Sequence, residues 1–181
     1  MCIRDRTGTH RETQQKGNLH PAMSDVEDKL RDAAKNLLAE GKIDLFIGYE
    51  KGTLPLRTRP CFVTAPGDVG KLVWNSLCSN NLAVYLPRYF QAGSRKNEDH
   101  PVRVGITAKG CDARSVVGLL TEHQVARENV VIVGVPCGGL VDPGKVARVL
   151  GGETVLGWEE DDAGTLRITL ESGRVEEVNR A

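Results

Sequence analysis

VRVGITA at residues 102–108 and NVVIVGV at residues 129–135 decide the fold of this chain. Each stretch is a nearly continuous apolar run, which is typical of a strand buried on both faces of a parallel sheet. Residues 113–123 between them have helical spacing, and a further short helix is predicted within residues 143–150. Strand, helix, strand and helix in this order predict a small parallel α/β domain of three layers with right-handed crossovers.

The preceding part of the chain predicts a helix and several shorter elements. Apolar residues at helical spacing are followed by Gly41 as a C-cap, and Ser24 with Glu27 resembles a capping box at the start of this helix. The predicted elements are a helix over 26–38, strands over 43–48 and 61–64, a short helix from Asp68 to Leu72, and a helix over 82–90 behind a cap at 79–81. Residues 93–101 are rich in polar residues and predict a surface loop.

The charge balance changes near Gly151 and Gly152. Residues 23–152 carry 17 basic and 14 acidic residues, whereas residues 153–181 carry 3 basic and 8 acidic ones. The latter part predicts β-rich segments over 154–159 and 165–171 joined at residues 161–164, with a third short strand over 174–178. We therefore expect an α/β domain of redox type over 23–152 and an appended acidic β-hairpin over 153–181.

Composition excludes several classes of protein. The 181 residues are 40% hydrophobic and 27% charged, so a folded core is expected. The formal net charge is zero and aromatic residues make up 4%, which argues against a nucleic-acid binder. No apolar run approaches the roughly 20 residues of a membrane-spanning helix. Five cysteines without a secretory signal indicate a reducing compartment, and a cytoplasmic location is predicted.

The first twenty-two residues lack the hydrophobic period of the rest. MCIRDR at residues 1–6 resembles a translated sequencing-adaptor scar, and Met23 looks like the true start. Residues 1–22 are therefore expected to be a non-native or disordered leader and are left out of functional reasoning.

Three cysteines lie at predicted turns next to strands or helices. Cys111 and Cys137 each follow a predicted parallel strand, at the sheet edge where open α/β folds bind ligands. Cys78 and Cys111 also precede predicted helices, with Asp112 as the N-cap of the second, and a helix N-terminus favours thiolate. Their wide spacing fits an iron–sulfur site better than zinc, yet small buried residues that fill turns would look the same.

Charged and glycine residues surround these thiols. Lys109 and Arg114 flank Cys111 and could hold a phosphate or carboxylate, or could be solvated charges. Gly138 and Gly139 would let the backbone approach a flat or anionic ligand. Dinucleotide and P-loop motifs are missing from the sequence.

Four stretches together resemble a known family: residues 44–62, 72–88, 104–120 (with GCDAR) and 130–139 (with GVPCGG). They are similar to the beta subunits of coenzyme F-420 hydrogenases and dehydrogenases, which are iron–sulfur proteins of anaerobes. The resemblance covers about residues 24 to 180. It implies an electron-transfer subunit that carries a 4Fe-4S cluster of ferredoxin type, with FAD as a second candidate cofactor, and that docks to larger redox enzyme subunits.

The resemblance also implies site residues. The cluster ligands would be Cys78, Cys111 and Cys137, and the cofactor-binding rim would be Lys109, Gly110, Asp112, Arg114, Gly138 and Gly139. Such proteins usually continue into a cysteine-rich segment, but no CxxC occurs here, so a fragment is expected. Two alternatives stay open, namely a cofactor-free docking domain that uses the acidic hairpin and a thiol enzyme that uses Cys111.

Overall fold

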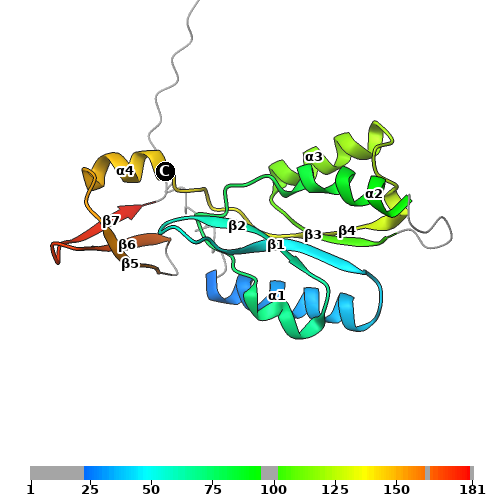
Figure 1. The fold of residues 1–181 in the computed structure, drawn as a ribbon, viewed down its shortest axis with the longest axis horizontal. Coiled ribbons are helices and arrows are strands. Elements are labelled where there is room, and N and C mark those ends of the chain that lie inside the picture. Colours follow the sequence, from blue (N-terminus) through cyan, green and yellow to red (C-terminus); the bar gives the residue numbers. More distant parts are fainter. Residues whose placement is uncertain (1–22, 95–101, 162–163, 180–181) are drawn as a thin grey trace, which may run out of the picture.

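The computed structural model describes residues 23–94, 102–161 and 164–179. Its strands form two sheets, sheet A in the order β2-β1-β3-β4 and sheet B in the order β5-β6-β7 (Figure 1). The elements of the first part are α1 (Met23–Ala39), β1 (Leu45–Lys51), β2 (Thr58–Val63), η1 (Pro66–Lys71), η2 (Leu82–Tyr85), α2 (Leu86–Ser94), β3 (Val104–Ala108), α3 (Gly110–Thr121), η3 (Arg127–Asn129) and β4 (Val130–Gly134). Those of the second part are α4 (Pro143–Leu150), β5 (Val155–Glu160), β6 (Thr165–Leu170) and β7 (Val175–Asn179). The α/β class is confirmed.

Sheet A is the middle layer of three. β1, β3 and β4 are parallel, with Leu45 opposite Val104 and Val104 opposite Val130. α1 covers one face of the sheet, and α2 and α3 cover the other (Figure 1). β2 differs from the predicted all-parallel sheet, because it returns through a hairpin and pairs antiparallel with β1. A short hairpin connection can produce only antiparallel neighbours.

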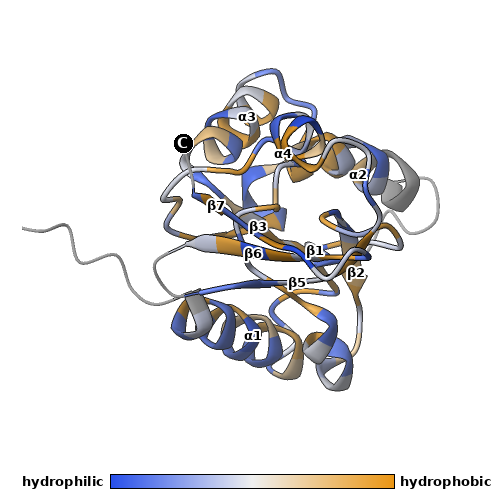
Figure 2. Cartoon of the chain, turned by 90° about the vertical axis from the view of Figure 1, so that its left-hand side faces the viewer, coloured by the Kyte–Doolittle hydropathy of each residue, from blue (hydrophilic) through white to orange (hydrophobic). Residues whose placement is uncertain are grey.

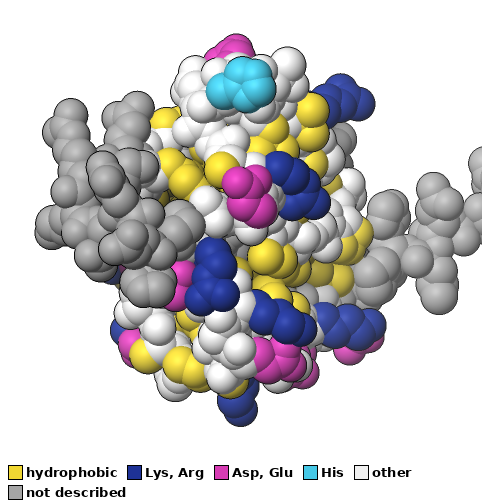
Figure 3. All heavy atoms as spheres, turned by 90° about the vertical axis from the view of Figure 1, so that its right-hand side faces the viewer, with side chains coloured by type: hydrophobic (Ala, Val, Ile, Leu, Met, Phe, Trp, Pro, Cys, Tyr) yellow, Lys and Arg dark blue, Asp and Glu magenta, His cyan; other side chains and the backbone are white. Residues whose placement is uncertain are grey.

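The larger hydrophobic core lies on both sides of sheet A. Strand residues such as Phe46, Ile47 and Ile106 are fully buried, as is Val116 of α3. Figure 2 shows apolar colouring along the strands and on the inward sides of the helices, with polar colouring on the outer side of α1. The apolar periodicity of residues 26–38 is thereby confirmed, since Leu30 and Ala34 of α1 belong to this core. On the face in Figure 3, basic and acidic side chains are interspersed.

Helix starts differ in detail from the prediction. α1 already begins at Met23, so Ser24 lies within its first turn. η1 is a 3₁₀ helix that begins at Pro66, whose fixed φ suits a first turn, so Asp68 is inside it instead of capping it. α3 begins at Gly110, which places Asp112 at its third position. The predicted cap before residue 82 is confirmed, because the Asn81 side chain accepts a hydrogen bond from the backbone N–H of Ala83.

Sheet B and α4 enclose a second, smaller core. Leu166, Ile168 and Leu170 of β6 are fully buried and pack with α4. Three residues from loops at the end of sheet A complete this core: Leu56, Leu77 and Val141. The predicted third strand is present as β7, so the acidic segment is a three-stranded sheet. α4 shares this core although it precedes Gly152, and the division of the chain after that residue stays a prediction.

Three predictions concern residues that lie wholly or partly outside the described ranges. Residues 1–22, predicted to be a leader, lie outside them. So do 95–101 of the predicted surface loop, whereas residues 93 and 94 belong to α2. Two residues of the predicted turn at 161–164 also lie outside the described ranges. At the two ends of this turn, the Gly164 N–H donates to the Asp161 carbonyl at 2.8 Å.

Candidate functional site

Four loops meet at one edge of sheet A, and three of them follow its parallel strands. These loops connect β1 to β2, η1 to η2, β3 to α3 and β4 to α4. The edge faces sheet B, which lies beyond the ends of the strands (Figure 1). Open α/β sheets bind ligands at the carboxyl ends of their parallel strands. The sequence predicts the candidate site at this same edge.

Lys109, predicted at the ligand rim, lies inside the protein. It follows β3 directly, and its side chain is 2% exposed. Its ammonium donates to the Tyr49 hydroxyl and to the Cys78 carbonyl at 2.9 Å, and it pairs with the Asp112 carboxylate at 2.8 Å. These contacts, with a longer one to the Asn80 carbonyl at 3.3 Å, occupy the three N–H donors of the lysine, so the group is committed within the chain. The alternative of a solvated charge is excluded by the same burial.

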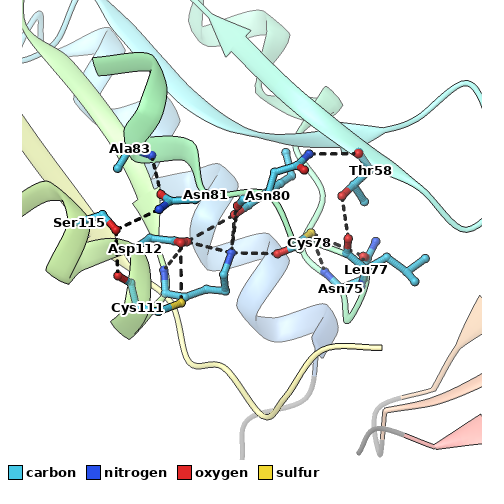
Figure 4. A network of polar contacts seen from close by, with 12 residues as sticks. Thr58, Asn75, Leu77, Cys78, Asn80, Asn81, Ala83, Cys111, Asp112 and Ser115 are labelled. Atoms are coloured by element: carbon cyan, nitrogen blue, oxygen red, sulfur yellow. Dashed lines mark hydrogen bonds and ion pairs between the residues drawn. The ribbon is translucent and has the colours of Figure 1, made fainter. Parts of the chain in front are cut away.

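Asp112 is the anionic partner in this buried cluster (Figure 4). Its carboxylate accepts from the Lys109 backbone N–H at 3.3 Å and so closes the first turn of α3. The Tyr49 hydroxyl, on β1, donates to the Asn80 carbonyl and lies 3.5 Å from the Asp112 carboxylate. Burial, reinforced by the negative charge of Asp112, raises the pKa of Tyr49. The cluster ties β1, β3, α3 and the loop before η2 together.

Cys78 is buried beside this cluster. Its sulfur lies 3.5 Å from the Asn75 side-chain oxygen and accepts from the Asn75 N–H (Figure 4). Burial raises the pKa of Cys78 to about 12, so the thiol is protonated at neutral pH. A cluster ligand must be a thiolate that reaches the metal, and this side chain is fully buried.

Cys111 and Cys137 are both exposed, in contrast to Cys78. Cys111 is the second residue of α3, and its sulfur lies 3.7 Å from the Asp112 carboxylate. Cys137 lies in the loop after β4. Among the described residues, no three Cys, His, Asp or Glu side chains are grouped as metal ligands would be. The structure therefore does not bring the three predicted ligands together.

The other predicted rim residues divide between two places. Gly110 and Arg114 are exposed in the first turns of α3. Gly138 and Gly139 lie in the loop after β4 and, with Cys137, line a small hollow against Trp74 to Ser76. The Ser76 hydroxyl is buried there and has no hydrogen-bond partner among the described residues. Buried hydroxyls are normally paired, so the Ser76 hydroxyl is an unsatisfied polar group beside this hollow.

A larger cavity, which the sequence reasoning missed, lies between α1, the end of β1 and β5. Its volume is about 730 Å³, within the range of small-molecule and cofactor sites. Both tryptophans of the chain, Trp74 and Trp158, line it. Trp74 is 4% exposed and belongs to the larger core, and it also contributes to this wall.

Some charged side chains of this cavity have hydrogen-bond or ion-pair partners, and others do not. Glu27 accepts from the Trp74 N–H at 2.8 Å and pairs with Arg31, and Glu160 accepts from the Ser76 N–H at 2.9 Å. Lys51, at the end of β1, is exposed and has no side-chain partner among the described residues. The cavity therefore offers aromatic surface together with an uncommitted cation.

Fold and site together define an α/β domain with a ligand-sized cavity between its two sheets. No model of a known protein family matches the chain. It is 26% identical over 140 residues to the beta subunit of F420-dependent formate dehydrogenase 1 of Methanococcus maripaludis, covering 77% of this chain and 33% of that protein. The chain thus spans about a third of the length of this curated relative.

A solved structure shares the fold. A chain of the F420-reducing [NiFe] hydrogenase complex from Methanosarcina barkeri matches with a TM-score of 0.57 and 17% identity, over 88% of this chain and 58% of that one. The chain is accordingly similar in sequence to the beta subunit of one F420-dependent dehydrogenase and shares its fold with a chain of an F420-reducing hydrogenase complex, in line with the resemblance of the four stretches. A search of the described residues for a helix long and apolar enough to cross a membrane finds none.

Proposed function

We propose that this chain is a redox component of an oxidoreductase complex of the F420-dependent type, docked to larger subunits. The observation that carries the proposal is its similarity, over 77% of the chain, to the beta subunit of an F420-dependent dehydrogenase. The shared fold with a chain of an F420-reducing hydrogenase complex supports it. A role in transferring electrons between a partner enzyme and a carrier follows from this relation.

The cavity between α1 and β5 would accommodate a flavin such as FAD. The volume of about 730 Å³ is adequate for a cofactor. Trp74 and Trp158 would contact the flat ring, and Lys51 would bind an anionic group such as a phosphate. When bound, a flavin supplies the ability to exchange electrons singly or in pairs. The residues of this chain would position it and shield it from water.

A 4Fe-4S cluster does not fit the described cysteines. Cys78 is buried as a hydrogen-bonded thiol, and the described residues hold no group of three ligands. Such clusters need four thiolates as a rule. We therefore derive no electron-transfer step through a cluster on these residues.

Exposed apolar side chains on sheet B support the docking alternative. Leu156 on β5 is 67% exposed. Val175 on β7, which lies opposite Thr169 of β6, is 55% exposed. The thiol-enzyme alternative has weaker support, because the Cys111 sulfur contacts the Asp112 carboxylate, which is already paired with Lys109 in the buried cluster.

Flavin binding to the full chain tests this proposal. Titration with FAD, followed by flavin and tryptophan fluorescence, should give one site per chain with quenching of both signals. Replacing Lys51 by Ala should weaken binding about tenfold, since a charge-assisted contact is worth about 1.5–3 kcal/mol. Leu54→Ala serves as the control, because Leu54 is exposed and does not line the cavity. If neither FAD nor FMN binds, or if Lys51→Ala binds as tightly as the parent chain, the flavin site is refuted.

A further inference from the structure

The tip of the β1–β2 hairpin, residues 52–57, inserts between the two sheets. The Gly52 N–H donates to the Arg57 carbonyl at 2.8 Å and closes the tip. Leu56 has φ +55°, in the left-handed region that residues other than glycine rarely adopt. Its side chain is 7% exposed and belongs to the smaller core, with β6 and α4. Burial of the side chain therefore holds an unfavourable backbone conformation in place.

The packing on both sides of this tip is incomplete. Pro55 lines the cavity of about 730 Å³ and also a second cavity of about 260 Å³. The second cavity is bounded by the tip, by Ala147 and Leu150 of α4, and by residues 152, 153 and 155. The tip therefore lies between the two cavities, which separate sheet A from sheet B and α4.

Besides the tip, the two parts are joined by a crossing of the chain, by a polar tie at Ser76 and by Leu77, which packs in the smaller core. In the described residues the chain passes between them once, through residues 135–142, which include Gly139 at φ +110°. The Ser76 backbone is a further polar tie, since its N–H donates to Glu160 and its carbonyl accepts from the Val141 N–H at 3.0 Å. A crossing segment with a glycine at positive φ is a place where the backbone could absorb a hinge rotation.

The geometry points to a conformational latch. The hairpin tip is seated in the smaller core when the two parts are closed, and it withdraws when sheet B and α4 rotate away from sheet A about residues 135–142. Withdrawal releases the strained backbone of Leu56 and opens the cavity that Trp74 and Trp158 line. This motion concerns the cavity whatever ligand occupies it, so it does not depend on the proposed flavin.

Tryptophan fluorescence measures how often the latch opens. Both tryptophans of the chain line the larger cavity, so acrylamide quenching of the ligand-free, full chain measures access to it. Leu56→Ala and Leu56→Gly both remove the buried side chain, and glycine also removes the backbone strain. Each should raise the quenching constant about twofold or more, because local opening becomes more frequent. The control is Leu54→Ala, in the same tip but with its side chain 68% exposed, which should match the parent chain.

Hydrogen exchange separates opening from general unfolding. In the Leu56 variants, amides of α4 and β6 should exchange faster, whereas those of β3 in sheet A should keep their protection. If the Leu56 variants quench like Leu54→Ala, the tip is not a latch. If β3 loses protection together with β6, Leu56 merely stabilises the whole chain and the inference is overturned. Absence of flavin binding would leave both measurements unaffected, so the two proposals fail separately.

Discussion

Replacement of Lys109 by Met should destabilise the protein strongly. The side chains of Lys109 and Asp112 are 2% and 3% exposed, and they pair at 2.8 Å. Removing the ammonium leaves a buried carboxylate without its counter-charge, which typically costs about 3–5 kcal/mol. The Cys78 and Asn80 carbonyls lose a donor at the same time. We expect a loss of about 4 kcal/mol and a fall in Tm of roughly 10 °C for a domain of this size.

The assay is equilibrium denaturation in urea with far-UV circular dichroism, on the single variants and on the double variant. Asp112→Asn keeps an oxygen that can accept from the Lys109 N–H but removes the charge. In Lys109→Met/Asp112→Asn no charge is left unpaired, so the double variant should be more stable than the sum of the single losses by at least about 1 kcal/mol.

A matched surface pair provides the control for this cycle. Arg103 and Asp44 lie 3.3 Å apart with side chains 44% and 49% exposed. Asp44→Asn should therefore cost less than about 1 kcal/mol. A loss below about 1 kcal/mol for Lys109→Met, or additive losses in the cycle, would refute the view that this pair is a coupled, buried charge cluster.

Three further predictions follow from burial and packing. The exposed Cys111 and Cys137 should react fast with a maleimide at pH 8, and the buried Cys61 and Cys78 should react slowly. The reason is that burial raises the pKa of Cys61 to about 11 and that of Cys78 to about 12. Peptide mapping that finds Cys78 labelled first would contradict this. These raised values favour the protonated thiols of the folded chain, so stability should fall as pH rises above 9, the ordinary thiol value; urea titrations at pH 7.5 and 9.5 check the sign. Gly48→Ala should cost about 1–3 kcal/mol, since its new Cβ would lie 2.5 Å from a Leu72 methyl, whereas Gly67→Ala has open space and should stay near parental stability in the same melts.

The strands that decide the fold were predictable because their signal is local. Residues 102–108 and 129–135 are apolar runs of strand length between turn residues, and they became β3 and β4 in the expected parallel pairing. The antiparallel direction of β2 does not follow from the local sequence, because residues 52–57 carry no two-residue hairpin signal such as Asn-Gly. The hydrogen bond from the Gly52 N–H to the Arg57 carbonyl that closes this turn is visible only in the structure.

The candidate site was predictable only as a region. The carboxyl edge of sheet A follows from strand order, so Cys111 and Cys137 were correctly placed after β3 and β4. Lys109 was misplaced, since lysine is rarely fully buried and burial depends on a partner distant in sequence. A signal existed, because Asp112 three residues later can pair with it on one helical turn. The larger cavity combines Arg31, Trp74 and Trp158, and no local pattern joins residues so far apart.

The shared smaller core has a consequence for the order of folding. The hairpins of sheet B are local and can form within about 1–10 μs. Their apolar face nevertheless depends on Leu56, Leu77 and Val141, which come from three separate loops at the edge of sheet A. Sheet B should therefore gain lasting structure only after the larger part has folded. For the same reason the C-terminal segment would make a poor module for transplantation, because on its own β6 would expose Leu166, Ile168 and Leu170 to water.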